Sequence, residues 1–279
     1  MHAPTEALSS LRCYRDASVR HASLAALLPS WLAPHAKATD ALEHPLAAHI
    51  PLFSAHIHRL RDAAAALGEL FPGTWTYRWS VEALLHSEAV AQLQDYLDRI
   101  QHSDIFVLRA SLRIKADGTS YAVIAPLSPA PSAPPVVRLD TQPVLLDTAT
   151  TPYKTDLRAA YDDARHRVHG TLGVAPITPD PSACFDVLLW HDEQGEQVLT
   201  ESSIANVVIE VPGPHPMLVT PSFSHLLPGL VVQALVHDGL VQQRRITVRE
   251  LQAWVSQSAR LWLCNAVRGM FEVRLATPA

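Results

Sequence analysis

The chain has 279 residues, of which 48% are apolar and 18% are charged, and its formal net charge is −5 at pH 7. This length predicts two domains, or one large one, with ample apolar material for a core, and the composition excludes disorder and collagen-like repetition. Dispersed arginines on an acidic chain argue against a nucleic-acid partner, and no basic run marks a membrane-surface helix. Only three of the 22 basic residues are lysines, namely Lys37, Lys115 and Lys154.

Cysteine and histidine usage favours a reducing compartment without a bound metal. Cys13, Cys184 and Cys264 are too few and too scattered for a disulfide framework, and none forms a zinc-finger pair. The 15 histidines are spread along the chain without a metalloprotease pair. The first twelve residues lack a signal-peptide pattern, and no apolar run approaches the ~18 residues of a membrane span. We therefore expect a cytoplasmic protein with neither metal nor membrane contact.

The first part of the chain predicts helices followed by a hairpin. We expect a short helix over residues 56–67 and a second helix capped by Ser80, whose apolar stripe runs through Leu84, Leu85, Leu93, Leu97 and Ile100. Residues 105–114 alternate as a strand, and a turn at residues 115–118 leads into a second strand over 121–125. One face of the first strand carries Arg109, Ser111 and Arg113, and the other Leu108, Ala110, Leu112 and Ile114.

A proline-rich stretch from Pro126 to Pro135 marks the clearest boundary, because proline removes backbone donors and fixes φ. We expect an N-terminal α/β domain over residues 1–125, a linker over 126–138 and a C-terminal domain over 139–279.

The second part of the chain mixes helices and strands. Leu157, Tyr161, Ala164 and Val168 have helical spacing, and Gly170 stands where a C-cap is expected. Strands are predicted over 185–190 and 204–211, joined through a turn at 192–195, and again over 261–264 and 271–275. Helices are predicted over 230–237, after Pro228-Gly229, and from Thr247, which has capping-box spacing to Glu250. The fold class is therefore α/β or mixed α+β.

Lys154 has the chemistry of a cofactor-binding residue, since a lysine amine can form a Schiff base with a carbonyl group. Most lysines are solvated surface charges, so Lys154 taken alone indicates little. The motifs around it carry more information. They are Tyr153-Lys154-Thr155, Asp186 to Trp190, Gly195, Glu201-Ser-Ser-Ile-Ala-Asn206, Thr220-Pro221, Leu227-Pro-Gly229, Asn265-Ala-Val-Arg-Gly269 and, upstream, His56-Ile-His-Arg59-Leu60.

In order and spacing these motifs resemble the class IV, pyridoxal-phosphate-dependent aminotransferase family. The resemblance implies the two-domain fold of D-amino-acid aminotransferase (fold type IV), with pyridoxal 5'-phosphate at the domain interface, residues 126–135 as the interdomain connection, and a homodimer. Within this family the chain is most similar to the fungal-type 4-amino-4-deoxychorismate lyases, through Ser10-Leu11-Arg12, the segment from Tyr153 to Arg165, and residues 265–269.

The resemblance assigns a role to each matching residue. Lys154 matches the lysine that forms the Schiff base with the cofactor and moves the substrate proton. Glu201 matches the carboxylate facing the pyridine nitrogen, and Arg59 the arginine that binds the phosphate, which an arginine fork suits. Leu230 and Val231 match the helix start whose backbone amides receive the same phosphate, and Asn206 matches a supporting position. Without the family resemblance, each residue has an ordinary structural interpretation. Glu201 would be an acidic residue at the end of a strand, Arg59 would be a solvated charge on a helix, and Pro228-Gly229 would only begin a helix.

Two departures from the family pattern reduce the number of side chains that could bind the phosphate. Ala266 stands where many relatives carry Ser or Thr, and Val232 stands where many aminotransferases carry Arg. Phosphate binding would then depend on Arg59 and the backbone amides.

The family divides between transamination and elimination. We expect a lyase that converts 4-amino-4-deoxychorismate, a small-molecule substrate, to 4-aminobenzoate and pyruvate, a step of folate biosynthesis. Arg109 and Arg113 share a strand face and could meet the two carboxylates of this substrate, with Arg12 as a third candidate. The alternatives are an aminotransferase of branched-chain or D-amino acids or amines, and a non-catalytic relative, which the presence of Lys154 and Glu201 disfavours.

Overall fold

The computed structural model describes residues 2–17, 23–37, 42–101, 106–128, 133–173, 183–213 and 216–276, and these form two compact units. Unit 1 comprises Met1–Pro129, Tyr153–Leu157 and Ala266–Arg268, and unit 2 comprises Ala130–Pro152, Arg158–Asn265 and Gly269–Ala279. Two short segments of the later chain, one of them containing Lys154, thus belong to the N-terminal unit.

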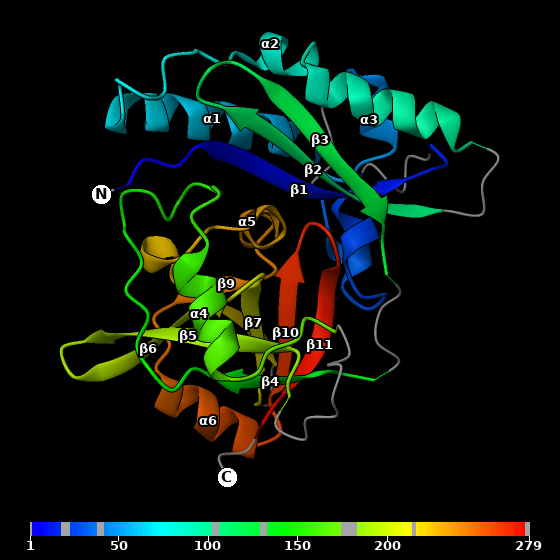
Figure 1. Ribbon diagram of the computed structural model, residues 1–279. Coiled ribbons are helices and arrows are strands. Elements are labelled where there is room, and N and C mark those ends of the chain that lie inside the picture. Colours follow the sequence, from blue (N-terminus) through cyan, green and yellow to red (C-terminus); the bar gives the residue numbers. More distant parts are fainter. Residues whose placement is uncertain are drawn as a thin grey trace. The chain divides into compact units, whose positions relative to one another are not determined.

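Unit 1 is an antiparallel three-stranded sheet with helices packed on one face (Figure 1). Its strands run in the order β1-β2-β3, and α1 and α3 cover them. The elements are β1 (Glu6–Tyr14), the short 3-10 helices η1 (Leu24–Leu27), η2 (Ala33–His35) and η3 (Pro45–Ala48), α1 (Phe53–Leu70), α2 (Val81–Leu85), α3 (Glu88–Arg99), β2 (Val107–Lys115) and β3 (Ser120–Pro126).

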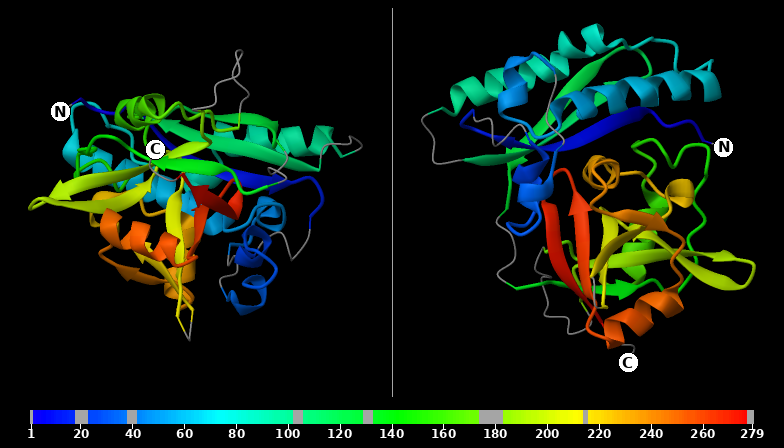
Figure 2. Two further views of the ribbon diagram at one scale, coloured as in Figure 1. Left: turned by 90° about the horizontal axis from the view of Figure 1, so that it is seen from below. Right: turned by 180° about the vertical axis from the view of Figure 1, so that it is seen from behind.

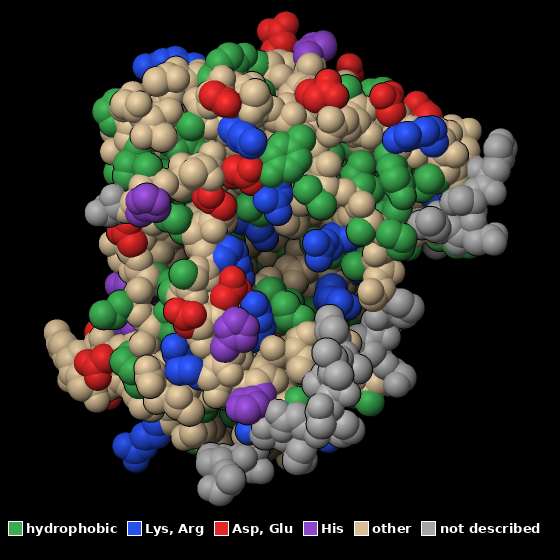
Figure 3. Space-filling model, in the orientation of Figure 1, with side chains coloured by type: hydrophobic (Ala, Val, Ile, Leu, Met, Phe, Trp, Pro, Cys, Tyr) green, Lys and Arg blue, Asp and Glu red, His purple; other side chains and the backbone are tan. Residues whose placement is uncertain are grey.

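The core of unit 1 lies between this sheet and α1 and α3. Alternate residues of β2 pack into it, and Leu108, Ala110, Leu112 and Ile114 are all buried, as their spacing predicts. The buried stripe of α1 follows helical spacing and includes a histidine: Phe53, His56, Ile57, Leu60, Ala63, Ala64 and Leu67. On the face drawn in Figure 3, acidic and basic side chains are interspersed over this unit.

The turn between β2 and β3 needs glycine for two reasons. Gly118 has φ +90°, a conformation that residues with a Cβ rarely adopt, and a Cβ there would lie 2.7 Å from Cδ2 of Tyr77. A residue with a side chain at this position would therefore strain the turn and clash with Tyr77.

Unit 2 contains an eight-stranded, strongly curved sheet in the order β6-β5-β4-β11-β10-β7-β8-β9 (Figure 2). The pairs β4–β5, β4–β11 and β8–β9 are parallel, and the others are antiparallel. The elements are β4 (Val136–Leu139), α4 (Ala159–Arg167), β5 (Asp186–Glu193), β6 (Glu196–Ser202), β7 (Asn206–Val211), β8 (Met217–Pro221), η4 (Phe223–His225), α5 (Leu230–His237), β9 (Gln242–Arg244), α6 (Val248–Ser256), β10 (Arg260–Asn265) and β11 (Gly269–Leu275).

Several local predictions are confirmed. Ser80 caps α2 by accepting a hydrogen bond from the Ala83 amide at 3.0 Å, and α5 spans the predicted residues. Thr247 and Glu250 form a complete capping box at the start of α6.

The helix predicted after Ser80 is wrong in its extent, because it consists of two helices. Ser87 interrupts it, donating its hydroxyl to the Leu84 carbonyl at 2.6 Å and accepting from the Val90 amide at 3.4 Å. A serine that satisfies backbone groups on both sides ends one helix and begins the next. The apolar stripe continues through the break because both helices pack on the same core.

The C-cap predicted at Gly170 lies elsewhere. Val168 is the C-cap of α4, and His169 adopts the left-handed conformation with φ 57°. Gly170 is one residue further on and donates to the Arg165 carbonyl at 2.9 Å, while His169 donates to His166 at 3.1 Å. These two bonds form a Schellman motif in which histidine occupies the position that glycine usually takes.

The turn at residues 192–195 does not join the two strands predicted on either side of it. It joins β5 to β6, a strand that the sequence reading missed. The expected linker over 126–138 includes residues 129–132, which lie outside the described residues, as does Ile105 of the predicted strand. Val136, within the expected linker, is the first residue of β4, which pairs on both sides and thus places this stretch inside the sheet of unit 2.

The capping box of α6 gives a stability prediction. Thr247→Ala removes the acceptor for the Glu250 amide, so we expect a loss of about 1 kcal/mol in the free energy of unfolding, measured by urea denaturation. Gln252→Ala, at an exposed position of the same helix, is the control and should change stability little. Equal denaturation midpoints for the two variants would contradict the prediction.

Candidate functional site

The backbone around Lys154 extends the sheet of unit 1 at β1. The Leu8 amide donates to the Lys154 carbonyl at 2.9 Å, the Asp156 amide donates to the Glu6 carbonyl at 3.3 Å, and Thr155 forms an antiparallel bridge with Ala7. This pairing fixes the main chain of the half-buried Lys154 relative to a core strand.

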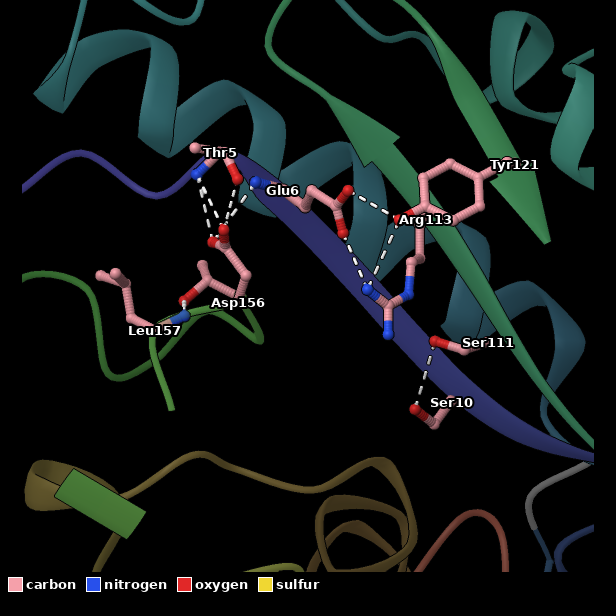
Figure 4. A network of polar contacts seen from close by, with 9 residues as sticks. Thr5, Glu6, Ser10, Ser111, Arg113, Tyr121, Asp156 and Leu157 are labelled. Carbon is pink, nitrogen blue, oxygen red and sulfur yellow. Dashed lines mark hydrogen bonds and ion pairs between the residues drawn. The ribbon is translucent and has the colours of Figure 1, made fainter. Parts of the chain in front are cut away.

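Asp156 reinforces that attachment (Figure 4). Its carboxylate accepts hydrogen bonds from the Thr5 amide at 3.1 Å, from the Glu6 amide at 3.3 Å and from the Thr5 hydroxyl. Thr155 also accepts from the Leu157 amide at 3.3 Å. The short lysine segment is therefore held by side chains as well as by strand pairing, which limits the positions that the lysine amine can reach.

His56 and Arg59 lie one turn apart on α1, and His56 is fully buried. Its Nδ1 is 2.7 Å from the Ser9 hydroxyl, and its Nε2 is buried without a hydrogen-bond partner among the described residues. Burial, and then the charges of Arg59 and Lys154, hold the pKa of His56 well below its ordinary value. The imidazole is therefore neutral, and it lies close enough to both cations to sense their charge.

The His56 ring shares one hydrogen bond with the Ser9 hydroxyl, and the tautomer of the ring sets which of the two groups donates. Burial lowers the pKa of Arg59 to about 10, which leaves its guanidinium charged at neutral pH. The charges of Arg59 and Lys154 near a neutral imidazole suit an anion.

The second face of the unit 1 sheet carries the arginines singled out by the sequence. Arg12 of β1 and Arg109 of β2 are directly opposite each other, and Arg113 lies further along β2. Arg113 is neutralised by Glu6, with its Nη1 2.8 Å from Oε2, and the Tyr121 hydroxyl donates to the other oxygen of Glu6 at 2.7 Å (Figure 4). Of the three, Arg113 is already committed to a partner within its own sheet.

In unit 2, Glu201 is buried near the end of β6, and its Oε1 accepts two hydrogen bonds. Its Oε1 accepts from the Tyr161 hydroxyl of α4 at 2.9 Å and from the Leu227 amide at 3.0 Å. Burial and the nearby Glu201 raise the pKa of Tyr161 above its usual value, which keeps the phenol protonated as a donor. This pair orients the carboxylate.

The residues after Glu201 form a bonded loop. Ser203 donates to the buried Asp186 carboxylate at 2.5 Å, its carbonyl accepts from the Arg158 guanidinium, and Arg165 donates to its hydroxyl at 3.3 Å. Asn265 donates to the Ile204 carbonyl at 3.3 Å. The motif that begins at Glu201 is therefore held from several elements of unit 2.

Asn206 positions the start of α5. Its Nδ2 donates to the Leu227 carbonyl at 2.8 Å and its Oδ1 accepts from the Gly229 amide at 2.8 Å. Gly229 is needed there, because a Cβ would lie 2.1 Å from Asn206 Oδ1. Asn206 thus bonds the backbone on both sides of Pro228.

Leu230 and Val231 begin α5 with buried side chains, so only their main-chain N–H groups could serve a ligand. Val232 is fully buried as well. Ala266 contributes through its carbonyl, which accepts from the Arg12 amide at 2.9 Å. The two departures from the family pattern therefore fill core or backbone roles.

The sequence-predicted residues separate between the units. Lys154, Arg59, Arg12, Arg109 and Arg113 belong to unit 1, and Glu201, Asn206, Leu230 and Val231 belong to unit 2. Sequence reasoning gave no role to the His56–Ser9 pair or to the Tyr161–Glu201 bond. Both residues lie in motifs that the sequence marks, His56 in the His-x-x-Arg motif and Tyr161 in the stretch after Lys154. The sequence did not indicate their hydrogen-bond partners.

Comparison with known proteins bears on this geometry. Residues 180–276 match the family described as amino-transferase class IV. A structure from Mesorhizobium loti, provisionally named an amino-acid aminotransferase, is 21% identical with a TM-score of 0.64, covering 97% of this chain and 99% of that one.

Two further solved structures are similar. One from Legionella pneumophila, provisionally named a 4-amino-4-deoxychorismate lyase, is 14% identical with a TM-score of 0.58, covering 98% of this chain and 84% of that one. An aminotransferase from Brucella abortus, bound to pyridoxal phosphate, is 12% identical with a TM-score of 0.59. The match covers 99% of this chain and 85% of that one. A search of curated proteins gave no match.

These likenesses confirm the predicted fold class, a mixed α/β fold of the class IV aminotransferase type. Among the described residues, no cluster of three or more His, Cys, Asp or Glu side chains could bind a metal ion. Within the same ranges, the helices are too short or too polar to cross a bilayer.

The Tyr161–Glu201 bond gives a prediction. Tyr161→Phe removes one of the two described donors to a buried carboxylate oxygen, so we expect a loss of about 2 kcal/mol in the free energy of unfolding at pH 7. Because the pKa of Tyr161 is raised in the folded state, this contribution should be constant below pH ~10, the pKa of an unfolded tyrosine, and should decline at higher pH.

Urea denaturation of both proteins from pH 7 to 11 measures this difference. Tyr77→Phe, at an exposed tyrosine, serves as the control. A difference between wild type and Tyr161→Phe that grows above pH 10 would contradict the assignment.

Proposed function

We propose that this protein is a pyridoxal-phosphate-dependent lyase that converts 4-amino-4-deoxychorismate to 4-aminobenzoate and pyruvate. The cofactor assignment is supported by Lys154, fixed along β1, and by the oriented carboxylate of Glu201, together with the family match over residues 180–276. The choice of reaction is supported by the sequence resemblance to 4-amino-4-deoxychorismate lyases, the name that the similar structure from Legionella pneumophila also carries. Arg12 and Arg109 lie opposite each other on the unit 1 sheet and could bind a substrate carboxylate.

The residues present fit the cofactor. Its phosphate is a dianion, and unit 1 offers a buried, neutral His56 whose Nε2 has no described partner, close to the cations of Arg59 and Lys154. Unit 2 offers the first N–H groups of α5, at Leu230 and Val231. Each unit by itself thus offers groups that suit a phosphate, in place of the serine, threonine or arginine that many relatives use.

Glu201 would face the pyridine nitrogen. When bound, pyridoxal phosphate withdraws electrons from the amine that it carries, so that a neighbouring carbon loses its proton readily. A carboxylate beside the ring nitrogen keeps that nitrogen protonated and strengthens the withdrawal. Tyr161 and the Leu227 amide, which both bond Oε1, would keep the carboxylate in the orientation that this contact needs.

Lys154 would bind the cofactor through Nζ and then move the proton of the substrate. In the proposed reaction Nζ removes the proton at the ring carbon that bears the amine, and the carbon–oxygen bond to the enolpyruvyl group breaks. The ring becomes aromatic, and the released enol takes up a proton to give pyruvate, so atoms balance without an oxidant or reductant. The hydrogen bonds of residues 154–156 to β1 would keep the amine within reach of this carbon.

The second candidate is a class IV aminotransferase acting on branched-chain or D-amino acids or amines. It is favoured by the similar structures from M. loti and B. abortus, which carry aminotransferase names. Such an enzyme would need a keto acid as a second substrate. A homodimer and a cytoplasmic location are further predictions of the sequence.

The cofactor assignment predicts a coloured protein. The purified protein, reconstituted with pyridoxal phosphate, should absorb visible light, and Lys154→Ala should lose that band because it lacks the attaching amine. Borohydride reduction followed by peptide mapping should label Lys154 and neither Lys37 nor Lys115. Lys115→Ala is the matched control and should keep the band. A protein that stays colourless after reconstitution would refute the proposal.

The reaction assignment predicts turnover without a co-substrate. Aminodeoxychorismate supplied alone should give equal amounts of 4-aminobenzoate and pyruvate. Chromatography measures the first product, and a coupled assay measures the pyruvate. Glu201→Gln should lower kcat at least ~100-fold, because a neutral amide cannot keep the ring nitrogen protonated. Turnover of an amino acid with a keto acid, and no product from aminodeoxychorismate, would instead establish the aminotransferase.

A further inference from the structure

The tyrosine that bonds Glu201 in unit 2 is itself covered by an arginine. Arg158 is the N-cap of α4 and Tyr161 lies three residues further on, a spacing that places both side chains on one side of the helix. The guanidinium carbon of Arg158 lies over the Tyr161 ring, 4.6 Å from its centroid. A guanidinium is attracted by the negative face of an aromatic ring, so this contact restrains the ring that carries the hydroxyl.

Arg158 is anchored on the loop that follows Glu201. Its Nη2 donates to the Ser203 carbonyl. Ser203 is buried, and its own hydroxyl donates to the buried Asp186 carboxylate at 2.5 Å. The guanidinium is therefore bonded to backbone that the core of unit 2 holds in place, and it bridges this backbone and the face of the tyrosine ring.

The charge of Arg158 acts on the Tyr161 hydroxyl as well as on the ring. Burial and the nearby Glu201 raise the pKa of Tyr161, and the charge of Arg158 acts in the opposite direction. A cation close to a phenol polarises its O–H bond, which makes the hydroxyl a stronger donor. That hydroxyl donates to Oε1 of Glu201 at 2.9 Å. Arg158 thus affects both the position and the strength of this hydrogen bond.

We propose that Arg158 is a positioning residue for the cofactor: anchored on Ser203, it holds Tyr161 so that the Glu201 carboxylate keeps the orientation needed by a pyridine N–H. A glutamate carboxylate rotates easily about its last torsion, and a hydrogen bond weakens steeply when donor and acceptor are misaligned. The role rests on the cofactor of the proposed function and applies equally to elimination and to transamination.

A ligand that lacks the ring nitrogen isolates the contact in question. In 1-deazapyridoxal 5'-phosphate a carbon replaces this nitrogen, while the aldehyde and the phosphate are unchanged. Calorimetry on the cofactor-free protein should show pyridoxal phosphate binding at least ~10-fold more tightly than this analogue. Arg158→Met keeps the length of the side chain but loses its charge and its donors, and it should lower that ratio about 5-fold.

Further variants separate positioning from general damage to the fold. Tyr161→Phe removes the hydroxyl and should lower the ratio at least as far, and adding Arg158→Met to it should cause no further loss. Arg158→Lys keeps a cation and should retain part of the preference. The matched control is Arg249→Met, at an exposed position of α6, which should leave the ratio unchanged. Circular dichroism checks that each variant is folded.

The outcomes separate this role from the proposed reaction. A merely structural role would weaken both ligands equally, so an unchanged ratio in folded Arg158→Met would overturn the inference, even if the wild type releases 4-aminobenzoate. A double variant well below Tyr161→Phe would also overturn it, because Arg158 would then act by another route. A lower ratio in Arg158→Met, in a protein that makes no 4-aminobenzoate, would support the positioning role and reject the lyase.

Discussion

The pairing of residues 154–156 with β1 is the constraint on which the proposed chemistry depends. The chain leaves unit 1 before residue 130, forms the first part of unit 2, and returns to unit 1 for five residues before α4 begins. Backbone hydrogen bonds and the carboxylate of Asp156 hold this return segment. A reactive lysine on a free loop would sample many positions, whereas one on a paired segment has a fixed main chain.

Buried polar groups show where the structure accepts a cost in stability. His56 is enclosed in an otherwise apolar stripe of α1, and its Nε2 has no partner among the residues described. Glu201 is buried, and hydrogen bonds from two donors to its Oε1 offset part of the cost of burying the carboxylate. Burial of an unsatisfied polar atom is unfavourable, so the buried Nε2 of His56 close to Arg59 and Lys154 is consistent with ligand binding.

Sequence patterns predicted the regular elements well where one rule controlled them. The alternation of β2, the capping box at Thr247 and the start of α5 after Pro228-Gly229 depend on neighbouring residues alone. The errors came where a side chain met a competing local partner. Ser87 bonds both Leu84 and Val90 and so divides a helix whose apolar stripe is continuous, and His169 takes the left-handed position that glycine was expected to fill.

The sequence by itself determined the candidate residues, because the motifs around Lys154, Glu201 and Arg59 are read from local order and spacing. Only the tertiary structure decided which charges are balanced. Arg109 and Arg113 are equivalent by alternation on one strand, yet Arg113 meets Glu6 across the sheet and Arg109 meets Arg12. Strand register sets these partners, and register depends on the pairing of β1 with β2, about 100 residues apart, rather than on any local pattern.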